Sequence, residues 1–163
     1  MLVAMSPRAS TPTVAVFDAI QDQLHLTTAT LRVLGCRVQP LLPGANGLQD
    51  VADQLQRDGP FDVVLWDLPH ALHGPCEDLR GLWHSGTFAS SGVVVTTADR
   101  DRLQPMLETW SGRPAILGRP YTFTSLMKAI GMATALREEA DLESGRQEEL
   151  ERVACRVHPT LVR

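Results

Sequence analysis

The stretch that most constrains the fold is an apolar run over residues 61–66 (FDVVLW), which stops at Asp67 and is followed by Leu68 and Pro69. An almost unbroken run of Val, Leu and Trp is typical of a strand buried on both faces, as in a parallel sheet covered by helices. In open α/β sheets, functional groups lie outside the carboxyl ends of the strands. Asp67 lies at such an end, so its chemistry depends on the side chains that other strand ends bring beside it.

Further short apolar segments alternate with segments of helical periodicity. The expected strands cover residues 14–18, 36–41, 62–67, 93–97 and 115–118. Between them, apolar residues spaced three or four apart predict helices. Pro40 removes a backbone donor, which favours an edge position for the second strand. This alternation predicts an α/β domain in which a five-stranded parallel sheet is doubly wound, with helices on both faces.

Length and composition restrict the class of protein. The 163 residues suffice for one domain with a core and an extension. No apolar run approaches the roughly 20 residues of a membrane span. Residues 1–12 lack the apolar core of a signal peptide, so we expect a flexible leader. Three scattered cysteines suit a reducing cytoplasm, and the net charge of -4 argues against direct nucleic-acid binding by this chain.

The composition changes from about residue 137 onward, where Glu and Arg dominate. Positions seven residues apart hold Leu136, Glu143, Leu150 and Val157, and Val153 lies half a repeat away. Two interpretations remain open, a coiled coil and a solvated helical tail, because Glu143 and Gly145 interrupt the seam. We expect residues 137–163 to form a helical dimerisation tail, and hence a homodimer.

The strand ends present a specific set of polar groups. Asp18, Asp67, Thr96 and Arg119 follow or close the first, third, fourth and fifth strands. Two carboxylates, a hydroxyl and a cation suit phosphoryl transfer to an aspartate. One carboxylate acts as the nucleophile, and the carboxylates also supply oxygen ligands for Mg²⁺. The hydroxyl and the cation neutralise the phosphoryl oxygens.

With Asp67, Thr96 and Pro120 at matching positions, residues 13–136 resemble the CheY-like receiver domains of bacterial two-component response regulators. The resemblance implies a flavodoxin-like sheet in the order 2-1-3-4-5 and a cis Arg119-Pro120 bond. It further implies that Asp67 accepts a phosphoryl group from a histidine kinase. Asp18 and Asp67 would then be the Mg²⁺ ligands.

Two departures point to a degenerate receiver. Ala19 occupies the second acidic position of the family, so a metal-binding carboxylate is missing, and Arg119 replaces the usual Lys. The guanidinium group of Arg is broad and planar, so it can pair with Asp67 and fill the pocket. We therefore expect a non-catalytic pseudo-receiver without a cofactor. The alternative is a working phospho-receiver that uses Mg²⁺.

A narrower resemblance rests on three runs: residues 14–18 (VAVFD), 34–38 (LGCRV) and 61–64 (FDVV). They are similar to the N-terminal domain of amidase-operon antitermination regulators of the AmiR/NasT type. That family combines a pseudo-receiver, a coiled-coil helix and a three-helix RNA-binding domain, and a ligand-sensing partner protein holds it silent. No three-helix segment follows the expected coiled coil here, so RNA binding is not carried over.

Two other candidates are weaker. His70, His73 and Cys76 are residue types that bind Zn²⁺, but the Pro and Gly residues around them predict a polar loop over the Asp67 cleft. A flavodoxin-like enzyme would need a Ser/Thr-rich phosphate loop after the first strand. Residues 19–22 (AIQD) do not provide one.

Overall fold

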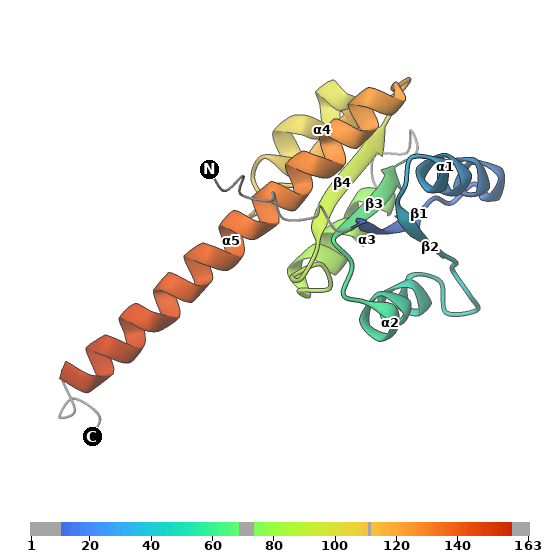
Figure 1. The fold of residues 1–163 in the computed structure, drawn as a ribbon. Helices are drawn as coiled ribbons and strands as arrows, with labels where there is room; N and C mark the ends of the chain where they lie inside the picture. The colour runs from blue at the N-terminus through green and yellow to red at the C-terminus, as the bar shows by residue number, and fades with distance from the viewer. Residues whose placement is uncertain (1–10, 69–73, 111, 158–163) are drawn as a thin grey trace, which may run out of the picture.

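The computed structural model describes residues 11–68, 74–110 and 112–157, with side chains described as far as residue 152. Strands and helices alternate along the chain (Figure 1). The strands are β1 (Thr13–Phe17), β2 (Arg37–Leu41), β3 (Val63–Leu68), β4 (Gly92–Thr97) and β5 (Ala115–Gly118). The helices are α1 (Gln21–Val33), α2 (Leu48–Asp58), α3 (Gly74–His84), α4 (Arg100–Leu107) and α5 (Phe123–Val157).

The five strands form one parallel sheet in the order β2-β1-β3-β4-β5. This confirms the predicted doubly wound, flavodoxin-like fold, and each predicted strand agrees with the observed one to within one residue at either end. β2 lies at the sheet edge and contains Pro40, as its missing backbone donor required. β3 lies at the centre, and all six of its residues are buried.

The side chains of β3 alternate between two cores. Val64, Trp66 and Leu68 belong to the core beneath α2, α3 and α4. Val63 and Leu65 belong to the core beneath α1 and α5. Because both faces of this strand are covered, its sequence is continuously apolar up to Asp67.

α5 packs closely on β4 because Gly92 has no side chain. A Cβ atom at Gly92 would lie 2.3 Å from the carbonyl oxygen of Ala133 in α5. Only glycine allows the helix backbone this close to the strand, since real Cβ atoms do not approach oxygen so closely. This contact sets the height of α5 above the sheet, just before the helix leaves the domain.

α5 is one continuous helix of 35 residues. It begins with a reciprocal cap, in which Ser125 N donates to Thr122 Oγ1 at 3.1 Å and Thr122 N donates to Ser125 Oγ at 2.9 Å. The helix then projects from the domain as a rod (Figure 1), and every residue from 138 to 152 is exposed. In the part of the chain that the structure describes, no helix is long and apolar enough to cross a membrane.

α4 is shorter than its sequence pattern suggests. Leu103, Met106, Leu107 and Trp110 are spaced as in a helix over residues 101–110, but α4 ends at Leu107 and contains Pro105. Beyond it the chain tightens, because Thr109 N donates to Met106 O and Trp110 N donates to Leu107 O. Trp110 remains buried despite lying outside the helix.

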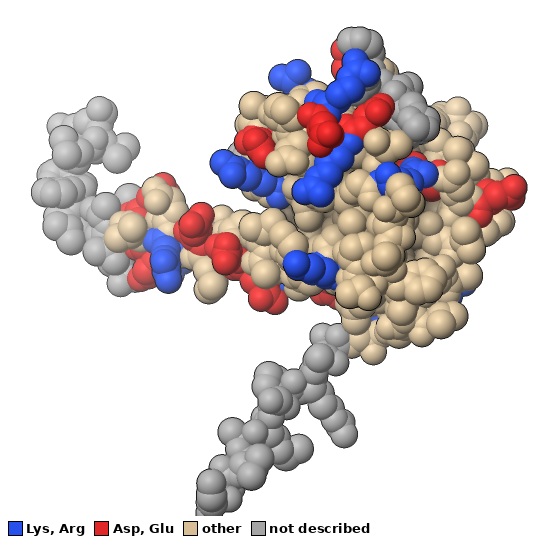
Figure 2. Space-filling view, turned by 90° about the horizontal axis from the view of Figure 1, so that it is seen from above, with Lys and Arg blue, Asp and Glu red and all other residues tan. Residues whose placement is uncertain are grey.

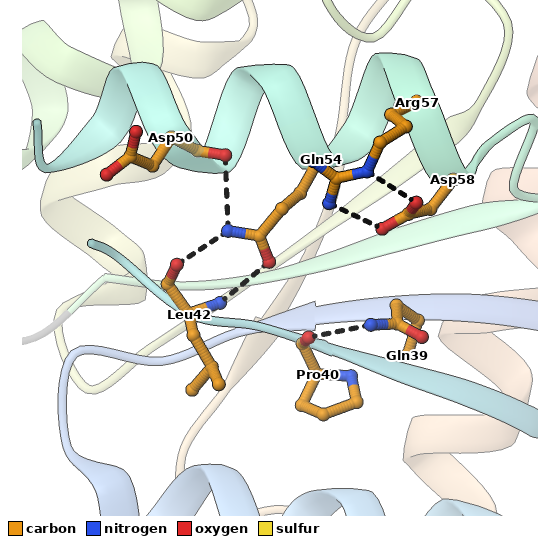
Figure 3. A network of polar contacts seen from close by, with 7 residues as sticks. All are labelled: Gln39, Pro40, Leu42, Asp50, Gln54, Arg57 and Asp58. Carbon is orange, nitrogen blue, oxygen red and sulfur yellow. Dashed lines mark hydrogen bonds and ion pairs between the residues drawn. The ribbon is translucent and has the colours of Figure 1, made fainter.

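The loop between β2 and α2 is fixed by the side chain of Gln54 (Figure 3). Its Nε2 donates to Leu42 O at 2.6 Å, and its Oε1 accepts from Leu42 N at 3.2 Å. The Gln54 amide therefore bonds both the backbone N–H and the C=O of the residue just beyond β2, as the backbone of a neighbouring strand would. Further along the loop, Asn46 donates from its backbone N and its Nδ2 to the Asp50 carboxylate, at 3.0 Å each. The loop thus has a defined conformation.

Candidate functional site

The predicted side chains converge at the carboxyl edge of the sheet. Asp18 follows β1, Asp67 lies in β3, Thr96 lies in β4 and Arg119 follows β5. Asp18, Asp67 and Thr96 are 7%, 5% and 2% exposed and line one small cavity. The parallel register places Asp67 directly opposite Thr96. The sheet thus brings together the candidate pocket that the sequence indicated.

Oδ1 of Asp67 is engaged twice. It accepts a hydrogen bond from Thr96 Oγ1 at 2.6 Å and forms an ion pair with Arg119 Nη2. Oδ2 of Asp67 is buried and has no hydrogen-bond partner among the described residues. The carboxylate therefore has one satisfied oxygen and one whose acceptor capacity is unused.

Arg119 is held in place from several sides. Its backbone N donates to Thr97 O at 2.7 Å, and its bond to Pro120 is cis, as the resemblance implied. Its Nη1 donates to Oε1 of Gln23 in α1 at 2.7 Å. The guanidinium thus connects Asp67 to α1. Gln23 was not predicted from sequence, and the only signal for it was a polar residue in the first turn of α1.

Asp18 lies beside the same cation but is not ion-paired with it. Its Oδ1 accepts a hydrogen bond from Ile20 N at 2.8 Å. Burial raises the pKa of Asp18, and the Ile20 hydrogen bond and the charge of Arg119 offset only part of that rise. The charged form of Asp18 is therefore disfavoured in the folded protein relative to water.

The donor set does not fit a dedicated Mg²⁺ site. Mg²⁺ takes oxygen ligands in near-octahedral geometry. Ala19 offers no side-chain ligand here, and Arg119 already occupies Oδ1 of Asp67. Over residues 11–68, 74–110 and 112–152, no cluster of three His, Cys, Asp or Glu side chains could hold a metal ion. The proposed roles of Asp18 and Asp67 as Mg²⁺ ligands thus remain predictions.

Of the three candidate Zn²⁺ ligands, Cys76 lies within the described residues. Cys76 is buried near the start of α3. His70 and His73 lie outside the described residues.

Comparison with solved structures places the fold among receiver domains. The chemotaxis protein CheY4 of Vibrio cholerae is 15% identical, with a TM-score of 0.59, over 76% of this chain and 99% of that chain. A response regulator from Thermotoga maritima is 20% identical, with a TM-score of 0.57, over 77% of this chain and 98% of that chain. These similarities establish a CheY-like fold.

A further solved structure extends along the projecting helix. It is a trimeric coiled-coil segment of yeast Spc42 fused to another structure, 14% identical with a TM-score of 0.61. The match covers 91% of this chain and 93% of that chain. No protein-family model and no curated protein sequence matches the chain.

Proposed function

We propose that this chain is a regulatory module of signal transduction, a pseudo-receiver that acts through protein–protein contacts and dimerisation rather than through catalysis. The observation that carries the proposal is the ion pair between Arg119 and Asp67. It engages Oδ1, one of the two carboxylate oxygens through which Asp67 would accept a phosphoryl group or bind a metal. Ala19 adds to the effect, because it removes a carboxylate from the place where Mg²⁺ would need one.

The second candidate function is a working phospho-receiver, and one observation favours it. Thr96 Oγ1 lies 2.6 Å from Asp67, and Oδ2 of Asp67 has no partner in the described structure. In that case Oδ2 attacks the phosphorus of a phosphohistidine on a kinase. The P–N bond breaks, and the imidazole leaves with the bonding electron pair. Arg119 would have to turn from Asp67 to the new phosphoryl oxygens.

Intact-mass measurement after incubation with Mg²⁺ and acetyl phosphate separates the two candidates. We expect no added phosphate on the wild-type chain. The double variant Ala19→Asp/Arg119→Lys supplies the missing carboxylate and a compact cation, so we expect it to gain phosphate. A phosphate on the wild-type chain that is lost in Asp67→Asn would establish the second candidate instead.

The projecting part of α5 supports a role in assembly. Leu142 and Leu150 are 64% and 65% exposed. Burying a Leu side chain is worth roughly 1.5–3 kcal/mol, so a partner helix would stabilise this segment. We propose a homodimer formed through α5, in line with the resemblance to antitermination regulators.

The nature of the regulatory partner follows from the two candidates. A pseudo-receiver would be controlled by a ligand-sensing protein, and a phospho-receiver by a histidine kinase. In both cases we propose a cytoplasmic location, since the three cysteines are scattered without a pairing pattern.

Direct nucleic-acid binding by this chain is not proposed. Residues 137–152 contain seven acidic and three basic side chains. Figure 2 shows acidic side chains along the projecting helix, and both signs of charge mixed on the body of the domain. Such a surface does not attract phosphates.

A further inference from the structure

A cavity of about 250 Å³ lies beside Asp67, at the ends of β1, β2 and β3. Its apolar walls are Phe17 and Trp66 from the sheet, Pro43 and Leu48 around the β2–α2 loop, and Pro75 from α3. This volume lies just below the usual range for ligand sites, which is roughly 300–1,000 Å³. It suits a ligand with a single ring and a short side chain.

The cavity is preformed. Phe17 and Trp66 stack with ring centroids 4.1 Å apart, and they are 8% and 1% exposed, so their positions are fixed by the core. On the opposite side, the Gln54 amide holds Leu42, the residue before Pro43 (Figure 3). A site whose walls are already ordered loses little freedom when a ligand binds.

Ala19 is the reason that space exists at this position. It lines the cavity, and its side chain is only a methyl group. A larger side chain here would extend into the space that the cavity occupies.

The polar groups of the cavity carry one sign of charge. Asp67 and Asp78 both line it, and none of its described lining residues is Lys, Arg or His. Asp67 is paired through Oδ1 with Arg119, which does not line the cavity. Only Oδ2 of Asp67 therefore retains acceptor capacity. Asp78 is exposed, and no salt bridge engages it among the described residues. Electrostatic complementarity therefore favours a cation.

From these observations we propose that the cavity beside Asp67 binds a small aromatic amine, with the ring against the walls made by Phe17, Trp66 and Leu48 and the ammonium directed to Asp78. Aromatic walls favour such a ligand because they bury its ring. This site goes beyond the proposed function and does not depend on whether Asp67 is phosphorylated.

The test compares ligands that share a ring and differ in charge. Binding of phenethylamine, 2-phenylethanol and phenylacetate to the full chain is measured by isothermal titration calorimetry and by ligand-observed NMR. We expect phenethylamine to bind most tightly and phenylacetate most weakly. No binding of phenethylamine would overturn the proposal, as would equal binding of the amine and the neutral alcohol.

Two variants then locate the site. Ala19→Leu places a larger side chain at the cavity, so we expect the Kd for phenethylamine to rise about tenfold, which corresponds to about 1.4 kcal/mol. Asp78→Asn removes one charge, and we expect about a threefold rise, as for an exposed ion pair. Glu77→Gln is the matched control, because Glu77 adjoins Asp78 in sequence but does not line the cavity.

Unchanged affinity in Asp78→Asn, or an equal loss in Glu77→Gln, would overturn the proposal. Because Asp78 is exposed, its variant keeps the test decisive even if Ala19→Leu fails to fold. Circular dichroism of each variant establishes that it is folded before binding is measured.

Discussion

Arg119 and Asp67 form an ion pair in which the carboxylate is more deeply buried than the guanidinium. The side chain of Asp67 is 6% exposed, and that of Arg119 is 27% exposed. A buried carboxylate needs a compensating charge, since its transfer out of water is costly. Arg119 supplies that charge, and the pair lies at the candidate phosphorylation site. Removing either partner has consequences that can be measured without a known signal or partner.

Arg119→Met leaves the Asp67 charge buried without its cation. We expect a loss of about 2–4 kcal/mol in the free energy of unfolding, measured with urea. Asp67→Asn in the same background should recover part of that loss. Arg57→Met is the matched control, because Arg57 pairs with Asp58 at the surface, where the two side chains are 67% and 34% exposed. Similar small losses in the Arg119 and Arg57 variants would show that the buried pair contributes little.

Asp18 gives a pH-dependent prediction of defined sign. Burial raises its pKa in the folded state, so the folded protein binds this proton more readily than the unfolded chain. The contribution to stability is present below the ordinary pKa and is lost as the pH rises through the raised value. Asp18→Asn should therefore be more stable than the wild type near pH 7, and the difference should shrink toward about pH 3.

Urea unfolding of the Asp18 variant at several pH values checks this sign. The amide oxygen of Asn can still accept the Ile20 hydrogen bond, so that contact is not the variable. A variant less stable than the wild type near pH 7 would mean that the charge of Asp18 is favourable where it lies.

Asp62 should show the opposite dependence. Burial raises the pKa of Asp62, but other interactions outweigh this effect and the net change is a decrease. Hydrogen bonds from Thr13 N and Thr13 Oγ1, each at 2.8 Å, lower the pKa, and so do the charges of Arg137 and Arg37. Its contribution to stability is present above the ordinary pKa and is lost as the pH falls through the lowered value.

Asp62→Asn should cost about 1–2 kcal/mol near neutral pH, a figure reduced for solvent screening because the side chain is about a third exposed. The loss relative to the wild type should fade in acid, measured by the same urea titrations. A loss that is equal at all pH values would assign the effect to packing rather than to charge.

The contact between Gly92 and Ala133 predicts a large effect from a single methyl group. Gly92→Ala would push α5 off β4, and we expect a loss of about 1–3 kcal/mol by thermal or urea unfolding. Gly131→Ala is the matched control. No atom lies within 4 Å of a Cβ built there, and it lies in α5, so we expect a gain of about 0.5–1 kcal/mol. A neutral Gly92→Ala would mean that α5 can shift without loss.

Sequence patterns predicted the fold because both faces of β3 are covered. Covered faces force a continuous apolar run, and strand–helix alternation then requires a parallel sheet. The convergence of Asp67 and Thr96 follows from that topology, since both lie at the carboxyl ends of adjacent strands. Element ends were less predictable, as in α4, which ends at Leu107 although the apolar spacing continues to Trp110.

Side-chain partners could not be predicted in the same way. The Gln23–Arg119 hydrogen bond joins residues 96 positions apart, and nothing in either local sequence marks it. The cavity beside Asp67 depends on how Ala19 and the β2–α2 loop lie relative to each other. Ala19 itself was visible in the sequence, but the cavity that it lines became visible only in three dimensions.

The last prediction concerns the projecting half of α5. At about 1.5 Å per residue, residues 138–157 extend roughly 30 Å beyond the domain. An isolated helix of this length is marginal in water, so a partner helix is the simplest source of stability. We expect the full chain to be a dimer by light scattering, whereas a chain shortened to end at Leu136 should be a monomer. The double variant Leu142→Glu/Leu150→Glu should also be monomeric, while Gln147→Glu, a change at an exposed polar position, should remain dimeric.

The acidic excess of this segment should make the dimer tighter at higher salt, because screening reduces repulsion between the two helices. A monomeric full chain would show that the segment is a solvated tail, and a trimer would show that the proposed two-helix contact is wrong.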